Sequence, residues 1–151
     1  MGLNYVKAKK EDADLLIELY NASFYEDYMR YGECPAYGRS RDSMEESIEK
    51  FPKHIIYCED KPIGAFSVVA QGNGEYYLGC LCIVSEYQGK GIGTQAMGFI
   101  LDYYEDWQKI TLITPADKEE NIAFYTKKCG FRIDSTEMDG NVRVAHFVLD
   151  R

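Results

Sequence analysis

A glycine-rich stretch at residues 87–94, Tyr-Gln-Gly-Lys-Gly-Ile-Gly-Thr, limits most strongly what this chain can fold into. It follows an apolar run, Leu78 to Val84, that predicts a strand, and it precedes apolar residues with helical spacing that begin at Ile92. The first turn of a helix has backbone N–H groups without internal partners, at the positive end of the helix dipole. Because glycines let a ligand approach that backbone closely, the pattern predicts a diphosphate-binding loop between a strand and a helix.

Several kinds of glycine-rich loop occupy such a position. A Walker-type loop needs Lys-Ser/Thr directly after its last glycine, whereas Gly93 is followed by Thr94, and Lys90 lies inside the loop. A dinucleotide fingerprint has the spacing G-x-G-x-x-G near the start of a domain, whereas this loop reads G-x-G-x-G and lies past mid-chain. A glycine-rich turn with no ligand is the remaining alternative to a phosphate site.

Two motifs resemble those of one family. The motif Gln-x-x-Gly-x-Gly at residues 88–93 resembles the acetyl-CoA loop of the GNAT N-acetyltransferases, with Ser85 in place of the proline that often precedes it. Residues 121–131, Asn-Ile-Ala-Phe-Tyr-Thr-Lys-Lys-Cys-Gly-Phe, are similar to the family helix that ends in Tyr and Gly-Phe. The family commonly has Tyr-x-x-x-Gly-Phe, and this chain has one more residue between Tyr125 and Gly130.

The resemblance implies acetyl-CoA as cosubstrate and assigns roles to residues. The backbone of the loop is expected to hold the CoA diphosphate, and the backbone of the preceding strand to pair with the pantetheine amides and polarise the thioester carbonyl. The residues expected to bind acetyl-CoA are Cys82, Ile83, Gln88, Gly89, Lys90, Gly91, Ile92, Gly93, Thr94, Asn121 and Lys128. Tyr125 is the candidate catalytic residue, as the general acid that protonates the departing thiolate.

The sequence leaves the general base and the acceptor open. Glu33, Glu75, His146 and an ordered water are alternatives for the base. The tyrosine-rich segment 24–41 lies where the family contacts its acceptor, and it either cages a cationic or aromatic amine or covers the sheet.

The spacing of apolar residues and turn signals predicts seven strands and four helices. The strands are expected at 3–8, 54–59, 62–70, 75–84, 110–114, 131–135 and 142–149, and the helices at 12–22, from 43, from 92 and from 117. A capping box at Ser43 is expected to open the second helix, which would bury Met44, Ile48 and Phe51. The order βααβββαβαββ is the GNAT arrangement, an α/β (α+β) fold with a mixed, mainly antiparallel sheet flanked by helices.

Composition sets the broad class. With 151 residues, of which 46% are hydrophobic, the chain is expected to form a single GNAT domain over residues 1–151. It has neither an apolar run of about 18 residues nor a secretory signal, and its five cysteines predict reduced thiols in the cytoplasm. Cys80 and Cys82 alternate on one strand, which is typical of core packing, so no metal is expected.

The net charge of the chain indicates which classes of partner to expect. The net charge is −8 and no basic stripe is visible, so neither a nucleic acid nor a membrane is expected as partner. The acidity favours a cationic acceptor weakly, and solubility alone is the preferred explanation for it. The first hypothesis is direct transfer of acetyl from acetyl-CoA to a primary amine of a small molecule or peptide. The alternatives are an acyl-CoA-binding regulatory module with weak or no catalysis and, less favoured, a nucleotide-binding protein; a homodimer is left open.

Overall fold

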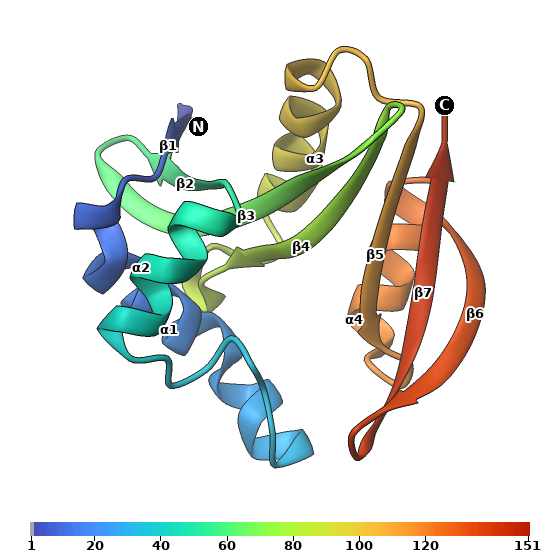
Figure 1. Cartoon of the computed structure of the whole chain (residues 1–151), viewed down its shortest axis with the longest axis horizontal. Helices are drawn as coiled ribbons and strands as arrows, with labels where there is room; N and C mark the ends of the chain where they lie inside the picture. The colour runs from blue at the N-terminus through green and yellow to red at the C-terminus, as the bar shows by residue number, and fades with distance from the viewer. Residues whose placement is uncertain (1) are drawn as a thin grey trace. The chain divides into compact units, whose positions relative to one another are not determined.

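The computed structural model describes residues 2–151, which contain seven strands and four α-helices in the predicted order (Figure 1). The elements are β1 (Leu3–Lys7), α1 (Ala13–Tyr31), α2 (Arg41–Lys50), β2 (Lys53–Cys58), β3 (Lys61–Gly72), β4 (Glu75–Ile83), α3 (Ile92–Tyr103), β5 (Lys109–Pro115), α4 (Glu119–Ala123), β6 (Arg132–Asp139) and β7 (Val142–Asp150). The strands follow the order β1-β2-β3-β4-β5-β7-β6. Strands β4 and β5 are parallel, while β1–β2, β2–β3, β5–β7 and β6–β7 are antiparallel, so the predicted mixed, mainly antiparallel fold is confirmed.

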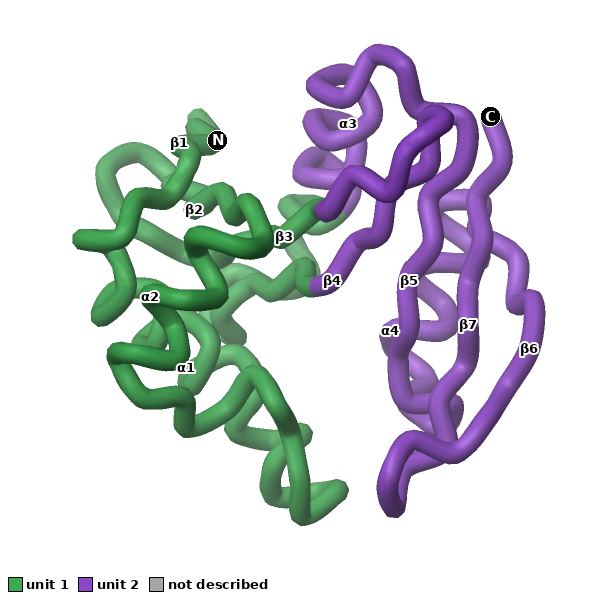
Figure 2. The backbone as a smooth tube through the Cα atoms, in the orientation of Figure 1, with its two compact units in different colours: residues 1–68, 80–93 green, residues 69–79, 94–151 purple. Residues whose placement is uncertain are grey.

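The chain forms two compact units, coloured separately in Figure 2. The first comprises residues 1–68 and 80–93, and the second comprises residues 69–79 and 94–151. Strands β3 and β4 therefore each contribute to both units.

The first unit buries one face of its strands under α1 and α2. Its core joins residues of both helices to residues of β2, β3 and β4, namely Ala8, Ala13, Leu16, Leu19, Tyr20, Met44, Ile48, Ile55, Ala65 and Cys82. Burial of these apolar side chains supplies the main stabilisation of this unit. An ion pair of 2.6 Å between Arg41 Nη1 and Asp14 Oδ2 links the two helices at the surface.

The second unit contains the β5–β7–β6 ladder and the start of β4. In the described chain, β4 and β5 pair only over Glu75–Tyr77 and Lys109–Thr111, although β5 runs on to Pro115. On its other edge β5 pairs with β7 over seven residues. Beyond Thr111, β5 has main-chain N–H and C=O groups on the edge away from β7. These groups form no ladder hydrogen bonds with β4 in the described chain.

Helix α1 and the entry to α2 differ from the prediction. Helix α1 was expected to end at residue 22, but it continues through residues 24–31 of the tyrosine-rich segment and ends only where Gly32 takes a left-handed φ of 74°. Helix α2 is capped by Ser40, whose Oγ accepts the Ser43 N–H at 3.1 Å, and not by Ser43 itself. Met44 and Ile48 are buried as expected, but Phe51 is 44% exposed because it lies past the end of the helix.

The turn between β2 and β3 also differs, by one residue. The strands expected at 54–59 and 62–70 leave Asp60 and Lys61 for the turn, but Glu59 takes the positive φ of 55° and Lys61 already belongs to β3. Within residues 2–151 no helix is both long and apolar enough to cross a bilayer.

Candidate functional site

The glycine-rich loop connects β4 to α3. A short 3-10 turn, Ser85–Tyr87, follows β4, and α3 starts at Ile92. Gly89 and Gly91 have left-handed φ values of 74° and 81°, a conformation that disfavours any side chain. A Cβ built on either would meet nothing within 4 Å, so the loop backbone is uncovered there. Gly93 differs from both, because it lies inside the first turn of α3.

Gln88 fixes the start of this loop to the end of β4. Its side-chain Nε2 donates to the Ile83 carbonyl oxygen at 2.8 Å, while its backbone N–H donates to Ser85 O at 3.2 Å. The glutamine of the motif therefore holds the loop in place through its side chain.

The end of β4 presents neighbouring residues to opposite edges of the strand. Val84 N–H donates to Ile63 O of β3 at 2.9 Å, and the Cys82 carbonyl oxygen lies 2.2 Å from where a Cβ of Gly64 would be. Both residues thus face β3, and because main-chain groups alternate along a strand, those of Ile83 point the other way. Of the two residues predicted to pair with pantetheine, Ile83 offers its N–H at the edge away from β3, and Cys82 faces β3.

Two lysines lie over one ring beside the loop. Lys90 Nζ is 5.2 Å and Lys61 Nζ 5.3 Å from the centre of the Tyr87 ring. Lys61 also approaches Glu86 Oε2 at 3.5 Å. The sequence predicted Lys90 as a phosphate partner but missed Lys61, because it is 29 positions away in the chain, on β3.

Tyr125 lies on the helix of the second motif, in the second unit. It is 7% exposed, and its ring contacts those of Phe124, Phe131 and Phe147 at 5.0, 5.7 and 5.8 Å between centroids. Asn121, on the same helix, donates from Nδ2 to Thr114 Oγ1 at 2.9 Å. The other two predicted residues of this unit, Thr94 and Lys128, are exposed.

The residue inserted after Tyr125 is absorbed by a π-helical turn. Residues Phe124–Lys128 form this turn, and Cys129 N–H donates to Phe124 O, five residues back, at 3.2 Å. A π turn accommodates one extra residue without ending the helix, and such turns are frequent at functional sites. Gly130 then takes a left-handed φ of 81°, and Phe131 N–H donates to Tyr125 O at 2.9 Å. The π turn therefore includes Tyr125 and absorbs the extra residue without ending the helix.

The family profile described as the acetyltransferase (GNAT) family matches residues 14–131. The chain belongs to the GNAT acetyltransferase family. Membership makes this GNAT protein an acetyl-CoA-dependent N-acetyltransferase. No curated protein shows significant sequence similarity to it.

Solved structures share the fold of this GNAT protein at low identity. An acetyltransferase from Thermus thermophilus is 16% identical, with a TM-score of 0.79 over 100% of this chain and 98% of its own. The spermidine N-acetyltransferase from Vibrio cholerae, solved with CoA and spermine, is 19% identical, with a TM-score of 0.77 over 98% and 95%. Aminoglycoside acetyltransferase AAC(6')-Ib, solved with coenzyme A, is 16% identical, with a TM-score of 0.77 over 99% and 95%.

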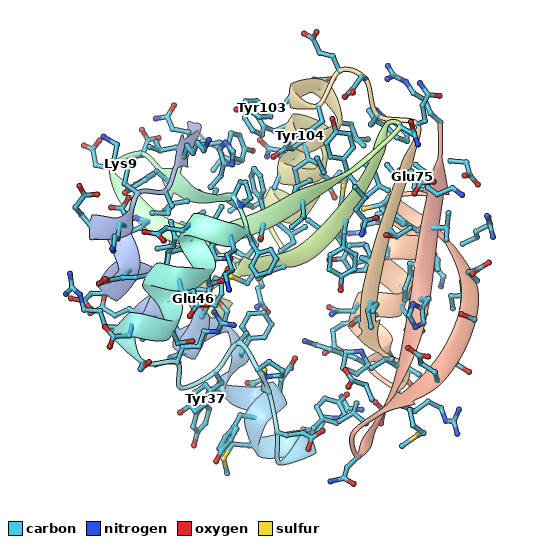
Figure 3. All side chains as sticks on the ribbon, viewed as in Figure 1. Lys9, Tyr37, Glu46, Glu75, Tyr103 and Tyr104 are labelled. Carbon is cyan, nitrogen blue, oxygen red and sulfur yellow. The ribbon has the colours of Figure 1, made fainter. Side chains whose placement is uncertain are left out.

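The candidate general bases lie in different surroundings. Glu75, labelled in Figure 3, is exposed at the first residue of β4, and Glu33 is exposed after α1. His146 on β7 lies 2.8 Å from Glu137 Oε1 of β6, measured from Nε2. This contact orients the imidazole. The choice among the three side chains and water stays open.

The first unit of this GNAT protein also buries a lysine that the sequence did not single out. Lys53 is 4% exposed at the start of β2. Burial lowers the pKa of its ammonium from 10.5 to about 8; Cys80 opposes this shift and Arg39 adds to it.

This buried lysine predicts that stability rises with pH. Between pH 8 and 10.5 the unfolded chain holds a proton that Lys53 has already lost in the native state, so unfolding becomes less favourable as pH increases. The difference in the free energy of unfolding, wild type minus Lys53→Met, should increase by on the order of 3 kcal/mol between pH 8 and 10.5. Below pH 8 this difference should change little. Urea titrations of both proteins at several pH values measure this difference, and a difference independent of pH would contradict the shift.

Proposed function

We propose that this protein transfers acetyl directly from acetyl-CoA to a primary amine, with no covalent enzyme intermediate. One observation carries the proposal: two left-handed glycines leave the loop backbone uncovered where it enters α3. Backbone N–H groups at a helix start attract phosphate by hydrogen bonding and through the helix dipole. The residues present therefore fit the diphosphate of CoA.

Each part of the loop has a defined task in this proposal. Backbone N–H groups from Gly89 to Thr94 bind the diphosphate, and the Gln88 side chain keeps the loop against β4. Lys61 and Lys90 add positive charge, although exposed lysines contribute little each. The loop thereby positions the thioester end along β4.

The Ile83 N–H is proposed to stabilise the charge on the thioester carbonyl oxygen. Negative charge builds on that oxygen during attack by the amine, and a fixed donor in place lowers the barrier. Tyr125 supplies the proton that the departing thiolate needs, since a phenol is a competent general acid. The Tyr125 role rests on the family motif.

The acceptor is proposed to meet the aromatic residues at the end of α1. Tyr28 and Tyr37 stack with their centroids 4.7 Å apart, and Tyr25 lies 6.1 Å from Tyr37, which Figure 3 labels. Tyr25 and Tyr28 are 51% and 41% exposed, so their rings can receive a ligand. The similar structures include a spermidine and an aminoglycoside acetyltransferase, so amines of varied size are accepted on this fold.

A regulatory acyl-CoA-binding module is the second candidate, because the insertion after Tyr125 departs from the family spacing. An amine panel separates the two functions: acetyl-CoA is incubated with polyamines, aminoglycosides, amino acids and peptides, and acetylated products are identified by mass spectrometry. Turnover of at least one amine, at a rate that rises with enzyme concentration, is the expected result. Tight CoA binding with no turnover of any amine would favour the module.

Gly91→Ala should weaken acetyl-CoA binding beyond its effect on stability. The left-handed backbone costs an alanine about 1–2 kcal/mol, and the added methyl group covers backbone that the diphosphate must reach. The matched control is Gly72→Ala, in the β3–β4 turn, where φ is 92° and a Cβ also meets nothing within 4 Å. Calorimetry with CoA should give a Kd raised about tenfold for Gly91→Ala and an unchanged Kd for Gly72→Ala. Equal Kd values for both variants would contradict the assignment of the loop.

The remaining proposals concern cellular location, domain organisation and oligomeric state. Within residues 2–151 the five cysteines form no disulfide, which supports a reducing, cytoplasmic location. We propose that residues 1–151 act as a single acetyltransferase domain; a homodimer stays a prediction.

A further inference from the structure

Strand β6 forms one edge of the sheet, and none of its side chains is buried. It lies outside β7 as the last strand of the order, and residues 2–151 contain no further strand beside it (Figure 1). All eight of its residues are exposed, among them two large apolar ones, Ile133 at 45% and Met138 at 54%. An edge strand of this kind presents main-chain N–H and C=O groups with which another strand can pair.

The usual protection of an edge strand is mostly absent from β6. Exposed edges are commonly kept apart by lysines, by proline or by being short. The sequence of β6, Arg-Ile-Asp-Ser-Thr-Glu-Met-Asp, contains neither lysine nor proline, and its eight residues exceed the common strand length of about five to six. Its one irregularity is a bulge, since the register against β7 shifts between Ile133 and Ser135 and leaves Asp134 as the extra residue.

The register against β7 divides the other side chains of β6 between two faces. Directly paired residues of an antiparallel ladder lie on the same face, and faces alternate along β7. Residues paired with Phe147, Ala145 and Arg143 therefore share one face, and these are Ile133, Thr136 and Met138. The residues on the opposite face are Arg132, Ser135, Glu137 and Asp139.

These two faces make β6 complementary to a second copy of itself. In an antiparallel pair with its two-fold axis at Thr136, and with the bulged residue outside the register, Thr136 opposes Thr136 of the second copy. Ile133 then opposes Met138 of the second copy, and Arg132 opposes Asp139. Ser135 and Glu137 form the remaining pair. Every pair joins side chains on one face, and the apolar and the oppositely charged pairs are of kinds that stabilise a sheet.

The bulge is what permits this arrangement. Without an extra residue, the eight positions would pair about a point between Ser135 and Thr136, and Asp134 would oppose Glu137 of the second copy. Like charges directly opposite one another destabilise strand pairing. With Asp134 outside the register, no two like charges oppose each other, and Asp134 keeps its ion pair of 3.3 Å with Arg132 of its own strand.

We propose that β6 is the interface of a homodimer, in which the β6 strands of two copies pair antiparallel and join two sheets into one. The inference is independent of the proposed acetyl transfer. Such a contact uses the same surface of both copies, so it closes as a dimer and does not continue into a fibre. An extended peptide of unrelated sequence would gain the main-chain hydrogen bonds alone, without the matched side chains. Because a single strand pair buries less area than a standard interface, we expect a weak dimer.

A charge exchange tests the register. Arg132→Glu and Asp139→Arg each place like charges opposite one another twice in the dimer, so each variant alone should raise the dimer Kd about tenfold in analytical ultracentrifugation. An equal mixture of the two variants should form a heterodimer with a Kd close to that of wild type, because both pairs then have opposite charges. This recovery also shows that the loss was not caused by misfolding of either variant.

A cysteine pair locates the two-fold axis. Thr136→Cys places two thiols opposite each other, within the Cα separation that a disulfide spans, so mild oxidation should link the copies covalently. Met138→Cys is the matched control on the same strand and face, because its two copies lie four strand positions apart, about 13 Å, and should not be linked. Wild type is oxidised in parallel to account for its five cysteines.

The expected result for wild type is a dimer fraction that rises with concentration between the micromolar and millimolar range. A protein that stays monomeric up to millimolar concentration would overturn the inference, and the edge would then be open to solvent or to an acceptor peptide. A dimer that the single charge variants leave unchanged, or that Met138→Cys links as readily as Thr136→Cys, would overturn it too, because another surface would then join the copies. None of these readouts involves acetyl transfer, so their failure leaves the proposed function standing.

Discussion

Replacing Tyr125 by phenylalanine should lower kcat by about 10²–10⁴-fold and leave acetyl-CoA binding unchanged. The substitution removes only the hydroxyl, and the ring keeps its contacts with Phe124, Phe131 and Phe147. Without the phenol, the thiolate must leave unprotonated or take a proton from water, so the chemical step slows. Steady-state kinetics at saturating acetyl-CoA, with the Kd from calorimetry, separates the chemical step from binding.

Tyr104→Phe is the matched control for this experiment. Tyr104 is a half-buried tyrosine directly after α3 whose pKa is raised to about 12, chiefly by burial, so it also loses a hydroxyl from a protected position. We expect its kcat to stay within about twofold of wild type, since substitutions away from the reacting groups change rates little. A kcat for Tyr125→Phe equal to that of Tyr104→Phe would remove Tyr125 from the chemistry.

Gly64→Ala should be the most destabilising single change among the glycines of the first unit. A Cβ on Gly64 would lie 2.2 Å from the Cys82 carbonyl oxygen and 3.3 Å from its carbon, and backbone atoms cannot move aside as a flexible side chain can. The strands must separate at the position where Ile83 presents its N–H. We expect a loss of about 3 kcal/mol or more in the free energy of unfolding, measured by urea titration, together with reduced kcat.

Gly98→Ala is the same chemical change as Gly64→Ala, but it is expected to stabilise the protein. Gly98 lies inside α3 and a Cβ there meets nothing within 4 Å, so alanine should stabilise the protein by about 0.5–1 kcal/mol. If Gly64→Ala proved as harmless as Gly98→Ala, the close approach of β3 to β4 at Cys82 would be wrong.

The order of elements was predictable because local signals and tertiary structure agree. The turn at Gly72, Asn73 and Gly74 needs three positive φ values, and its residues are those that adopt them most readily. The buried residues Ile92, Ala96 and Ile100 of α3 show plain helical spacing. The start of α2 was less predictable, because Ser40 and Ser43 both fit a cap and only the packing of the helix decides between them.

The π turn shows where sequence periodicity stops being informative. The sequence revealed an extra residue between Tyr125 and Gly130, but an insertion can shift the helix, break it or bulge it. Helical phase gives no preference among these outcomes. The structure shows that the insertion is accommodated by the π turn Phe124–Lys128, which includes Tyr125 itself.

The burial of Lys53 could not be predicted from the sequence, for a different reason. A lysine before a strand is normally solvated, and Lys53 was placed outside the strand predicted from His54. Its surroundings include Cys80 and Arg39, which are distant along the chain. Such convergence of separate segments is a tertiary property, and no local pattern reports it.

The central claim is that the backbone of the loop binds the diphosphate of acetyl-CoA. Calorimetry with acetyl-CoA, compared with acetylpantetheine, which has the same thioester arm and no diphosphate, tests it most directly. The account predicts a Kd for acetyl-CoA in the range of about 1 μM to 1 mM and binding of acetylpantetheine at least about tenfold weaker. Equal affinity for the two ligands, or no heat from millimolar acetyl-CoA, would contradict it.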